Sequence, residues 1–381
     1  MNAGRLFVRS AGAVTPAGTG VAALLRALGD PGFQAELGLA RPDAGPLPVA
    51  VCRDFSTAGV LPPLVARRLD RPSRLLAVAA REALSAAGDP LPWPNDRVGV
   101  AAGTWTAGTS ALVEVLRAVF LASPEEAPPA QFPSTVANAP ASQLAIIEKL
   151  SGPNLTFAEK QVGGLRAMAE AARMLVGGRA DAVLACGADE GDWLNAEGYL
   201  RLGALRSDRG PGMTLCEGAA ALVLSREPGS SPMAALAGWA SAGALAPPYA
   251  YPADPAPLAD VCARAIDRAG ILPPEIDLVV SMANGIPALA ELELSAMKTV
   301  FGSHAPAAIG VADRIGDGAV VGTVRTLIAA LAVRGAVHPA WGPPPRLRDA
   351  GFRPLSGRPR AALVAGVAGG GSTLALVITA A

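Results

Sequence analysis

Short runs of apolar residues alternate along this chain with longer stretches rich in Ala, Leu and Arg. Apolar runs of this length are typical of buried β-strands, and the longer stretches have the apolar spacing of helices. The alternation predicts an α/β fold whose strands are covered on both faces. We expect strands at residues 6–14, 97–104, 182–188, 220–225, 277–283 and 361–368. We expect helices at 72–88, 109–122, 141–150, 162–178, 258–270, 289–302 and 321–335.

A stretch rich in Pro and Gly, residues 228–256, separates two halves of similar layout. Each half opens with a strand, continues with a helix, a second strand and an exposed loop, and closes with a hairpin. This repetition predicts an internal duplication rather than two independent domains. The expected halves are residues 1–227 and 228–381.

The C-terminal residues 361–381 carry no charge and raise the question of a membrane span. Their centre, GVAGGGST, contains too much Gly for a stable helix but suits two strands joined by a tight turn. We therefore expect a buried hairpin there. The first residues, MNAGRLFVRSAGAVTP, lack the layout of a signal peptide. The sequence thus predicts a cytoplasmic protein without a membrane segment.

The overall charge and hydropathy narrow the range of partners. Lys plus Arg and Asp plus Glu number 32 each, and aromatic residues make up only 4% of the chain. These values argue against nucleic acid and anionic membrane surfaces as partners. Hydrophobic residues make up 51% and the mean hydropathy is +0.36. Either an apolar subunit interface or the abundance of Ala explains this excess.

The cysteines are scattered through the sequence, at Cys52, Cys186, Cys216 and Cys262. They form no CxxC pair and have no His neighbours, so we expect neither a metal site nor a disulfide framework. The sequence also contains no phosphate-binding loop. We therefore expect no metal, nucleotide or flavin cofactor.

Residues 152–168, GPNLTFAEKQVGGLRAM, lead from an expected strand into a helix that opens with two glycines. Further motifs accompany this turn: VRSAGAVTPAGTG (8–20), DRVGVAAGT (96–104), FPSTVANAPASQLAI (132–146), GADEGDW (187–193), CEGAAALVLS (216–225), AMKTVFG (296–302) and GGGSTLALV (369–377). In their order and spacing, the chain resembles the β-ketoacyl synthase family of the thiolase fold over nearly its whole length. The resemblance implies an α/β, thiolase-like duplicated five-layer αβαβα fold.

The family's chemistry needs a cysteine that takes the acyl chain and two histidines that stabilise the enolate and the oxyanion. The cysteine position, two residues before Gly163, holds Gln161. The first histidine position holds Asn284, in a loop shortened by two residues, and the second holds Asp317. The lysine that usually lies five residues earlier is replaced by Ala312. An amide cannot form an acyl thioester, so the resemblance implies a centre without an intact catalytic group.

No histidine elsewhere can replace the missing ones. The chain contains two, His304 and His338, and each follows the end of an expected helix. We expect both to be surface or capping residues. A Cys/His/His ketosynthase is therefore excluded by counting. The glycine-rich gate near the end of the family's chains is also reduced here, to GVAGG at 366–370.

The run AEKQVGGL (158–165) resembles the chain-length-factor branch of the family, in which Gln replaces the cysteine. This resemblance implies a heterodimer with an active ketosynthase that elongates a polyketide or polyene chain on acyl carrier protein. The present subunit would then shape the tunnel that holds the chain. The sequence does not decide between an aromatic polyketide and an aryl polyene product.

The helix at 109–122 would form the cap of such a tunnel. Thr109, Leu112, Val113 and Leu116 lie at helical spacing on it and are the best candidates, although for any single one of them an ordinary core position is the favoured interpretation. The segment that resembles the family's dimer interface, residues 132–146, adds Phe132 and Asn138 as interface candidates.

Three roles are open for Gln161. It can fill the space of a lost site, order the partner's site across the interface, or help to decarboxylate malonyl carrier protein with Asn284 as a second amide donor. Asp317 opposes decarboxylation, because it places a carboxylate where negative charge develops. Next to Gln161, Glu159 and Lys160 are expected to form a salt bridge to the partner subunit rather than a new acid/base pair.

Two other functions stay open. The chain could be a malonyl-carrier-protein decarboxylase that works without a covalent intermediate, or a homodimeric pseudo-enzyme that holds acyl chains or carrier protein. Four arginines are candidates for a surface that docks an acidic carrier protein, although solvated arginines are common: Arg71, Arg74, Arg206 and Arg209.

Overall fold

The computed structural model describes residues 5–41, 44–88, 91–207 and 210–381. Within them, an 11-stranded mixed sheet runs through the molecule in the order β12-β11-β13-β14-β10-β1-β9-β7-β5-β6, with the short β2 paired to β1. Its strands are β1 (Leu6–Thr15), β2 (Gly18–Thr19), β5 (Val98–Gly103), β6 (Asn154–Phe157), β7 (Ala182–Asp189), β9 (Gly218–Ser225), β10 (Ala234–Gly243), β11 (Leu278–Val280), β12 (Ala307–Ile309), β13 (Ala361–Val367) and β14 (Ser372–Thr379).

The sheet consists of two halves with the same topology. The strands of each half can be numbered 1 to 5 along the chain. Across the sheet, the first half then has the order 1-5-4-2-3 (β1-β9-β7-β5-β6), and the second half has the same order (β10-β14-β13-β11-β12). The directions also match, because the fifth strand is antiparallel to its neighbours and the others are parallel. Short antiparallel pairing of β1 with β10 joins the halves. This repeat is the structural signature of a duplicated unit, and a boundary at 227/228 stays a prediction.

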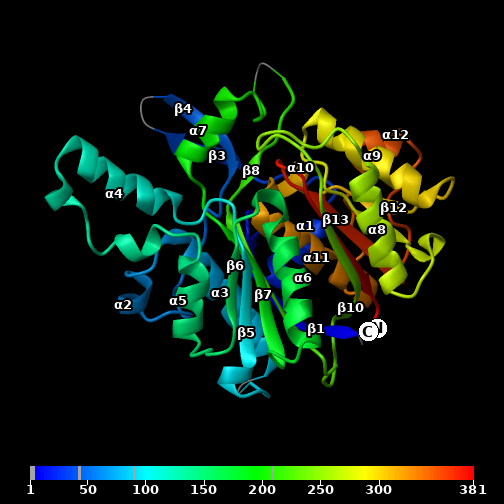
Figure 1. The fold of residues 1–381 in the computed structure, drawn as a ribbon, viewed down its shortest axis with the longest axis horizontal. Helices are drawn as coiled ribbons and strands as arrows, with labels where there is room; N and C mark the ends of the chain where they lie inside the picture. Colours follow the sequence, from blue (N-terminus) through cyan, green and yellow to red (C-terminus); the bar gives the residue numbers. More distant parts are fainter. Residues whose placement is uncertain (1–4, 42–43, 89–90, 208–209) are drawn as a thin grey trace.

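Helices cover the sheet in three layers (Figure 1). The main helices are α1 (Val21–Leu28), α3 (Arg71–Ala87), α5 (Ala139–Ile147), α6 (Gly163–Val176), α8 (Ala256–Arg268), α9 (Pro287–Phe301) and α11 (Ala319–Arg334). In the middle layer, α6 and α11 pack on each other and contact strands of both halves. On the outside, α3 covers the first half and α8 covers the second. With the two halves of the sheet, these three helical layers give the expected five-layer arrangement.

Burial explains why the middle layer forms. Every residue of α11 from Ala319 to Val333 is buried, so this helix is apolar around its whole circumference rather than along one face. By contrast, α3 is fully buried only in its middle, from Leu75 to Ala80, and begins with a cap, in which the Asp70 carboxylate accepts from the backbone N–H of Ser73 at 3.0 Å. The expected C-terminal hairpin is confirmed, because β13 pairs with β14 from Ala361 to Val367.

A smaller unit lies beside the large sheet. It consists of a three-stranded sheet in the order β3-β4-β8 and of α7. The bounds are β3 (Leu37–Arg41), β4 (Ala44–Ala50), β8 (Leu215–Cys216) and α7 (Trp193–Arg201). The long helix α4 (Thr109–Leu121) extends away from the body of the molecule (Figure 1). Short helices complete the chain: α2 (Pro63–Ala66), α10 (Ala312–Ile315), α12 (Pro345–Asp349) and the 3₁₀ turns η1 (Asn95–Arg97), η2 (Pro124–Glu126), η3 (Phe132–Ser134), η4 (Lys160–Val162) and η5 (Pro273–Glu275).

The structure also bears on the cysteines and on the question of a membrane segment. All four cysteines are free and buried. Among the described residues, no group of His, Cys, Asp and Glu is arranged to hold a metal ion. None of the helices in these residues has the length and hydropathy required to cross a membrane.

Candidate functional site

Gln161 lies in the tight turn η4, between the end of β6 and the start of α6. The residue before it, Lys160, has φ 49°, a left-handed conformation that costs a non-glycine residue about 1–2 kcal/mol. After the turn, α6 approaches α11 so closely that only glycine fits. A Cβ on Gly164 would lie 2.4 Å from the carbonyl oxygen of Ala319. The turn therefore keeps its strained geometry although the thiol is missing.

The three residues expected at the catalytic positions, Gln161, Asn284 and Asp317, meet in one hydrogen-bonded cluster, which also contains Tyr251. Gln161 Nε2 donates to the Tyr251 hydroxyl oxygen at 3.0 Å, and Asn284 Nδ2 donates to the same oxygen at 3.1 Å. Asn284 Nδ2 also donates to Asp317 Oδ2 at 2.7 Å. Gln161 is only 9% exposed, and Asn284 and Asp317 are buried as well. We call these four residues the degenerate centre. The fourth replaced position, Ala312, begins α10 and brings only a buried methyl group.

Charge in the degenerate centre is set by burial. Burial raises the pKa of Asp317 to about 6, although the hydrogen bond from Asn284 and the Arg325 guanidinium act in the opposite direction. Burial and then the nearby Asp317 raise the pKa of the Tyr251 hydroxyl, so it stays protonated at neutral pH. The buried Arg325 donates to the carbonyl oxygen of Ala365 at 2.6 Å. At pH 7 the centre thus holds a carboxylate that is mostly ionised and no neighbouring imidazole.

The loop that carries Asn284 is fixed by a buried acid. Glu293 of α9 accepts from the Ser281 hydroxyl at 2.6 Å and from the backbone N–H of Met282 at 2.9 Å. Asn284 itself accepts from the backbone N–H of Ile286 at 3.1 Å. These bonds hold the shortened loop in a defined conformation, so the Asn284 amide is preorganised toward Tyr251.

Glu159 and Lys160 have partners within their own chain. Glu159 accepts from Arg166 Nε at 3.0 Å and from the Ser372 hydroxyl at 2.9 Å. Lys160 Nζ donates to the carbonyl oxygens of Pro248 and Gly369. The expected salt bridge to a partner subunit stays a prediction. The structure shows that both side chains already serve to hold the turn against the second half of the chain.

The two histidines lie away from the degenerate centre. His304 and His338 are both exposed, and the His304 ring packs edge-on against Phe301. The expectation that they are surface residues is confirmed. Tyr251 is the functional residue that the sequence analysis missed. It lies in the Pro/Gly-rich stretch at 228–256, which was interpreted only as a separator, and the chain contains just 3 tyrosines.

A second candidate site is a cavity of ≈1020 Å³ between the start of α3 and the start of α4. Four arginines from residues 67–74 line it together with four carboxylates: Arg67, Arg68, Arg71, Arg74, Asp70, Glu114, Glu190 and Glu217. Arg67 and Arg68 are exposed, and their side chains form no ion pair or hydrogen bond with any described residue. We call this the basic cavity.

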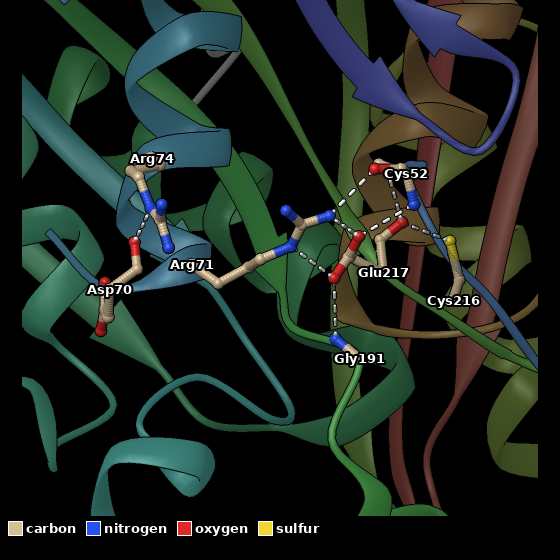
Figure 2. Close-up of polar contacts among 7 residues, drawn as sticks. All are labelled: Cys52, Asp70, Arg71, Arg74, Gly191, Cys216 and Glu217. Carbon is tan, nitrogen blue, oxygen red and sulfur yellow. Dashed lines mark hydrogen bonds and ion pairs between the residues drawn. The ribbon is translucent and has the colours of Figure 1, made fainter. Parts of the chain in front are cut away.

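Arg71 is not free to bind a partner (Figure 2). Its Nε and Nη2 atoms donate to the two oxygens of the buried Glu217 at 2.9 and 2.6 Å, and Nη2 also donates to the carbonyl oxygen of Cys52 at 2.9 Å. Glu217 thus already pairs with the charge of Arg71, and the expected docking role of Arg71 stays a prediction. Arg206 does not line this cavity, and Arg209 lies outside the described residues.

The floor of the basic cavity holds an acid with a perturbed pKa. Burial raises the pKa of Glu190 to about 7, and the neighbouring Asp192 and Asp70 add to this effect, while hydrogen bonding to Ser110 opposes it. The backbone N–H of Ser110 donates to Glu190 Oε1 at 3.1 Å. Near neutral pH, Glu190 is therefore partly protonated.

The tunnel candidates on α4 are arranged differently from an ordinary core. Only Ala111 of this helix is buried, while Leu116 is 41% and Phe120 77% exposed. Leu112 is exposed to the same extent as Leu116, and Val113 is half-buried. The alternative that these residues belong to the core is wrong for the leucines. Thr109 instead accepts from Asn195 of α7 at 3.0 Å and anchors the helix start.

Exposed apolar side chains continue from α4 into the next elements. Seven of the fifteen large apolar side chains exposed in the described chain lie in this region: Leu112, Leu116, Phe120, Leu121, Phe132, Val136 and Ile146. The turn η3 contacts both α4 and α5, and α5 packs on β6. Asn138, exposed at the start of α5, lies on the same stretch. We call this surface the apolar face.

Two family models match the chain. Residues 54–229 match "Beta-ketoacyl synthase, N-terminal domain", and residues 233–340 match "Beta-ketoacyl synthase, C-terminal domain". A 3-oxoacyl-[acyl-carrier-protein] synthase 2 of Coxiella burnetii is 27% identical over 367 residues, which cover 88% of this chain and 87% of the relative. The tetracenomycin polyketide synthase ketoacyl synthase beta subunit of Streptomyces glaucescens is 28% identical over 271 residues, 66% of each chain.

A solved structure described as the ishigamide ketosynthase/chain length factor has the same fold. It superimposes with a TM-score of 0.85 and 20% sequence identity, covering 99% of each chain. At this identity the likeness concerns the fold alone. It confirms the expected thiolase-like architecture.

Proposed function

Because the chain belongs to the β-ketoacyl synthase family, we propose that it is the non-condensing subunit of a heterodimeric ketosynthase. In this role it pairs with an active ketosynthase and shapes the tunnel for a polyketide or polyene chain on acyl carrier protein, as a chain-length factor does. The observation that carries the proposal is that Gln161, in the turn η4, forms a hydrogen bond with Tyr251 in a centre without thiol or imidazole. A centre of this composition cannot hold an acyl chain covalently.

The apolar face supports the partner part of the proposal. Its exposed leucines and phenylalanines lie on α4, which stands away from the body of the chain (Figure 1). Next to it, β6 ends the sheet and pairs only with β5 among the described strands. Stable interfaces need about 800 Å² of buried surface per partner and an apolar centre. A projecting helix with exposed apolar side chains beside an open strand edge supplies an apolar centre, and so we propose that the ketosynthase binds here.

Co-expression with a ketosynthase that retains its Cys/His/His set tests the pairing. We expect a one-to-one complex by native mass spectrometry, elongation of carrier-bound chains by that complex, and no condensation by this chain alone. Leu116→Asp and Phe120→Asp should each weaken the complex at least about tenfold, because a charge must then be desolvated at the interface. Leu272→Asp, at an exposed leucine after α8, is the matched control and should have no effect. A chain that forms only homodimers would refute the pairing.

The basic cavity supports acyl carrier protein as a second partner. Arg67 and Arg68 are exposed and unpaired within the described chain, so they can meet an acidic surface without breaking an internal ion pair. Arg67→Glu with Arg68→Glu should lower the rate of elongation by the complex and make it less sensitive to salt. Arg179→Glu, at an exposed arginine outside the cavity, is the control. Equal rates for both variants would rule out docking at this cavity.

One observation favours a second candidate function, the decarboxylation of malonyl carrier protein. The amides of Gln161 and Asn284 donate to one oxygen, at 3.0 and 3.1 Å, which is the arrangement of an oxyanion hole. Two features oppose it: Tyr251 occupies the oxygen position, and Asp317 brings negative charge to the same amide. Carbon dioxide release by the isolated chain, lost in Gln161→Ala, would establish this function. No release above the spontaneous rate would exclude it.

A further inference from the structure

The degenerate centre is filled by a side chain from a distant part of the sequence. Tyr251 lies 90 residues after Gln161 and 33 residues before Asn284, and its hydroxyl oxygen accepts from both amides. Residues 244–251, which end with Tyr251, form an irregular segment after β10 that we call the strap. Its outer side is exposed, with Tyr249 at 78%, whereas Tyr251 points inward to the centre.

Several hydrogen bonds hold the strap across the turn η4. Lys160 Nζ donates to the carbonyl oxygen of Pro248, and it lies 5.8 Å from the centroid of the Tyr249 ring. The turn between β13 and β14 holds the strap at two further points. Gly370 N–H donates to Ala250 O at 3.1 Å, and Ala244 N–H donates to Gly371 O at 2.8 Å. The strap is thus bound to the turn that carries Gln161 and to the C-terminal hairpin.

The centre has the hydrogen-bonding groups that recognise a hydroxyl. Two amide N–H groups converge on the Tyr251 oxygen, and a hydroxyl oxygen can accept both. Gln161 Oε1 is buried and has no hydrogen-bond partner among the described residues, although its own amide nitrogen bonds the same tyrosine. The two donors thus suit an oxygen acceptor, and the acceptor that occupies this position in the chain is a phenol hydroxyl.

We infer that Gln161 and Asn284 form a binding site for a phenolic hydroxyl, and that the chain's own Tyr251 is the ligand that occupies it. The site takes a planar ring with one hydroxyl, and the strap determines whether an external ring can enter. This inference concerns the chain alone, so it stands whether or not the chain pairs with a ketosynthase. It also explains how a centre that has lost its catalytic groups keeps its buried amides bonded.

Cavity complementation tests the site. Tyr251→Ala removes the phenol and leaves both amide donors, and p-cresol then supplies the missing ring and hydroxyl. We expect p-cresol to bind this variant with a measurable increase in its melting temperature, and to bind roughly tenfold more tightly than toluene, which lacks the hydroxyl. Leu245→Ala, at a fully exposed side chain of the same strap, is the matched control and should bind neither compound. Equal affinity for p-cresol and toluene would overturn the hydroxyl site, and so would equal binding of p-cresol by the control.

A second measurement keeps the inference testable if Tyr251→Ala does not fold. Gln161→Cys places a thiol at the turn, and the four native cysteines are buried and give little background. With Tyr251 in place, we expect a maleimide to label this thiol on the order of 100-fold more slowly than the thiol of Leu245→Cys, at an exposed position of the strap, because the strap must open first. Equal labelling rates for the two thiols would show that the phenol does not fill the centre.

Discussion

Replacing Asp317 with Asn removes a buried carboxylate from the degenerate centre and keeps an oxygen that can accept from Asn284. Burial raises the pKa of Asp317 from 3.8 to about 6. A carboxyl group with a raised pKa favours the folded state while it is protonated, so this contribution is complete below pH 4. It is lost as the pH rises through 6, where the folded protein must hold the charge. The loss at pH 7 amounts to about 3 kcal/mol of unfolding free energy.

Urea denaturation of the wild type and Asp317→Asn between pH 4.5 and 7.5 measures this contribution of Asp317 to the unfolding free energy. We expect the variant to gain stability relative to the wild type with increasing pH, by about 2 kcal/mol over this range. Glu190, whose pKa burial raises to about 7, also titrates here, but it is present in both proteins and cancels in the difference. Glu190→Gln in each background checks this cancellation. A stability difference that is independent of pH, or that decreases as the pH rises, would refute the burial argument for Asp317.

Two further predictions concern the packing around the two sites. In a urea titration, Gly164→Ala should cost about 1–3 kcal/mol of unfolding free energy, because its Cβ would meet the Ala319 carbonyl oxygen. Gly198→Ala, in a helix with open space around that residue, is the control and should cost nothing. Glu217→Gln should cost about 2 kcal/mol, because it leaves the partly exposed Arg71 without its ion pair; a change below about 0.5 kcal/mol would show that the pair contributes only as a surface contact.

The fold could be predicted from the sequence where elements are long or have clear ends. The expected helix at 72–88 is observed at Arg71–Ala87, and the expected strand at 182–188 at Ala182–Asp189. The repeat of two halves followed from the spacing of such elements. The short strand β12, by contrast, was not predicted. Its three residues carry no periodicity of their own, and it forms a strand because β11 offers it hydrogen bonds.

Within the candidate site, the sequence indicated which groups are missing but not what replaced them. Gln161, Asn284 and Asp317 could be located because each lies beside a glycine-rich motif. Tyr251 has no such motif, and its role arises only when the strap folds back across the turn. The ion pair of Arg71 could not be predicted either, since its partner Glu217 lies 146 residues further along the chain. Pairings at this distance depend on the tertiary fold and leave no local pattern.

The degenerate centre is closed by its own hydrogen bonds. A buried amide without a partner costs about 1–3 kcal/mol, so the buried amides of Gln161 and Asn284 need acceptors. In this chain Tyr251 accepts from both amides, and Asn284 also bonds Asp317. The phenol thus fills the space and satisfies the donors at once. Under the function proposed above, a subunit closed in this way would support its catalytic partner through the apolar face, because its own centre would not have to open for substrate.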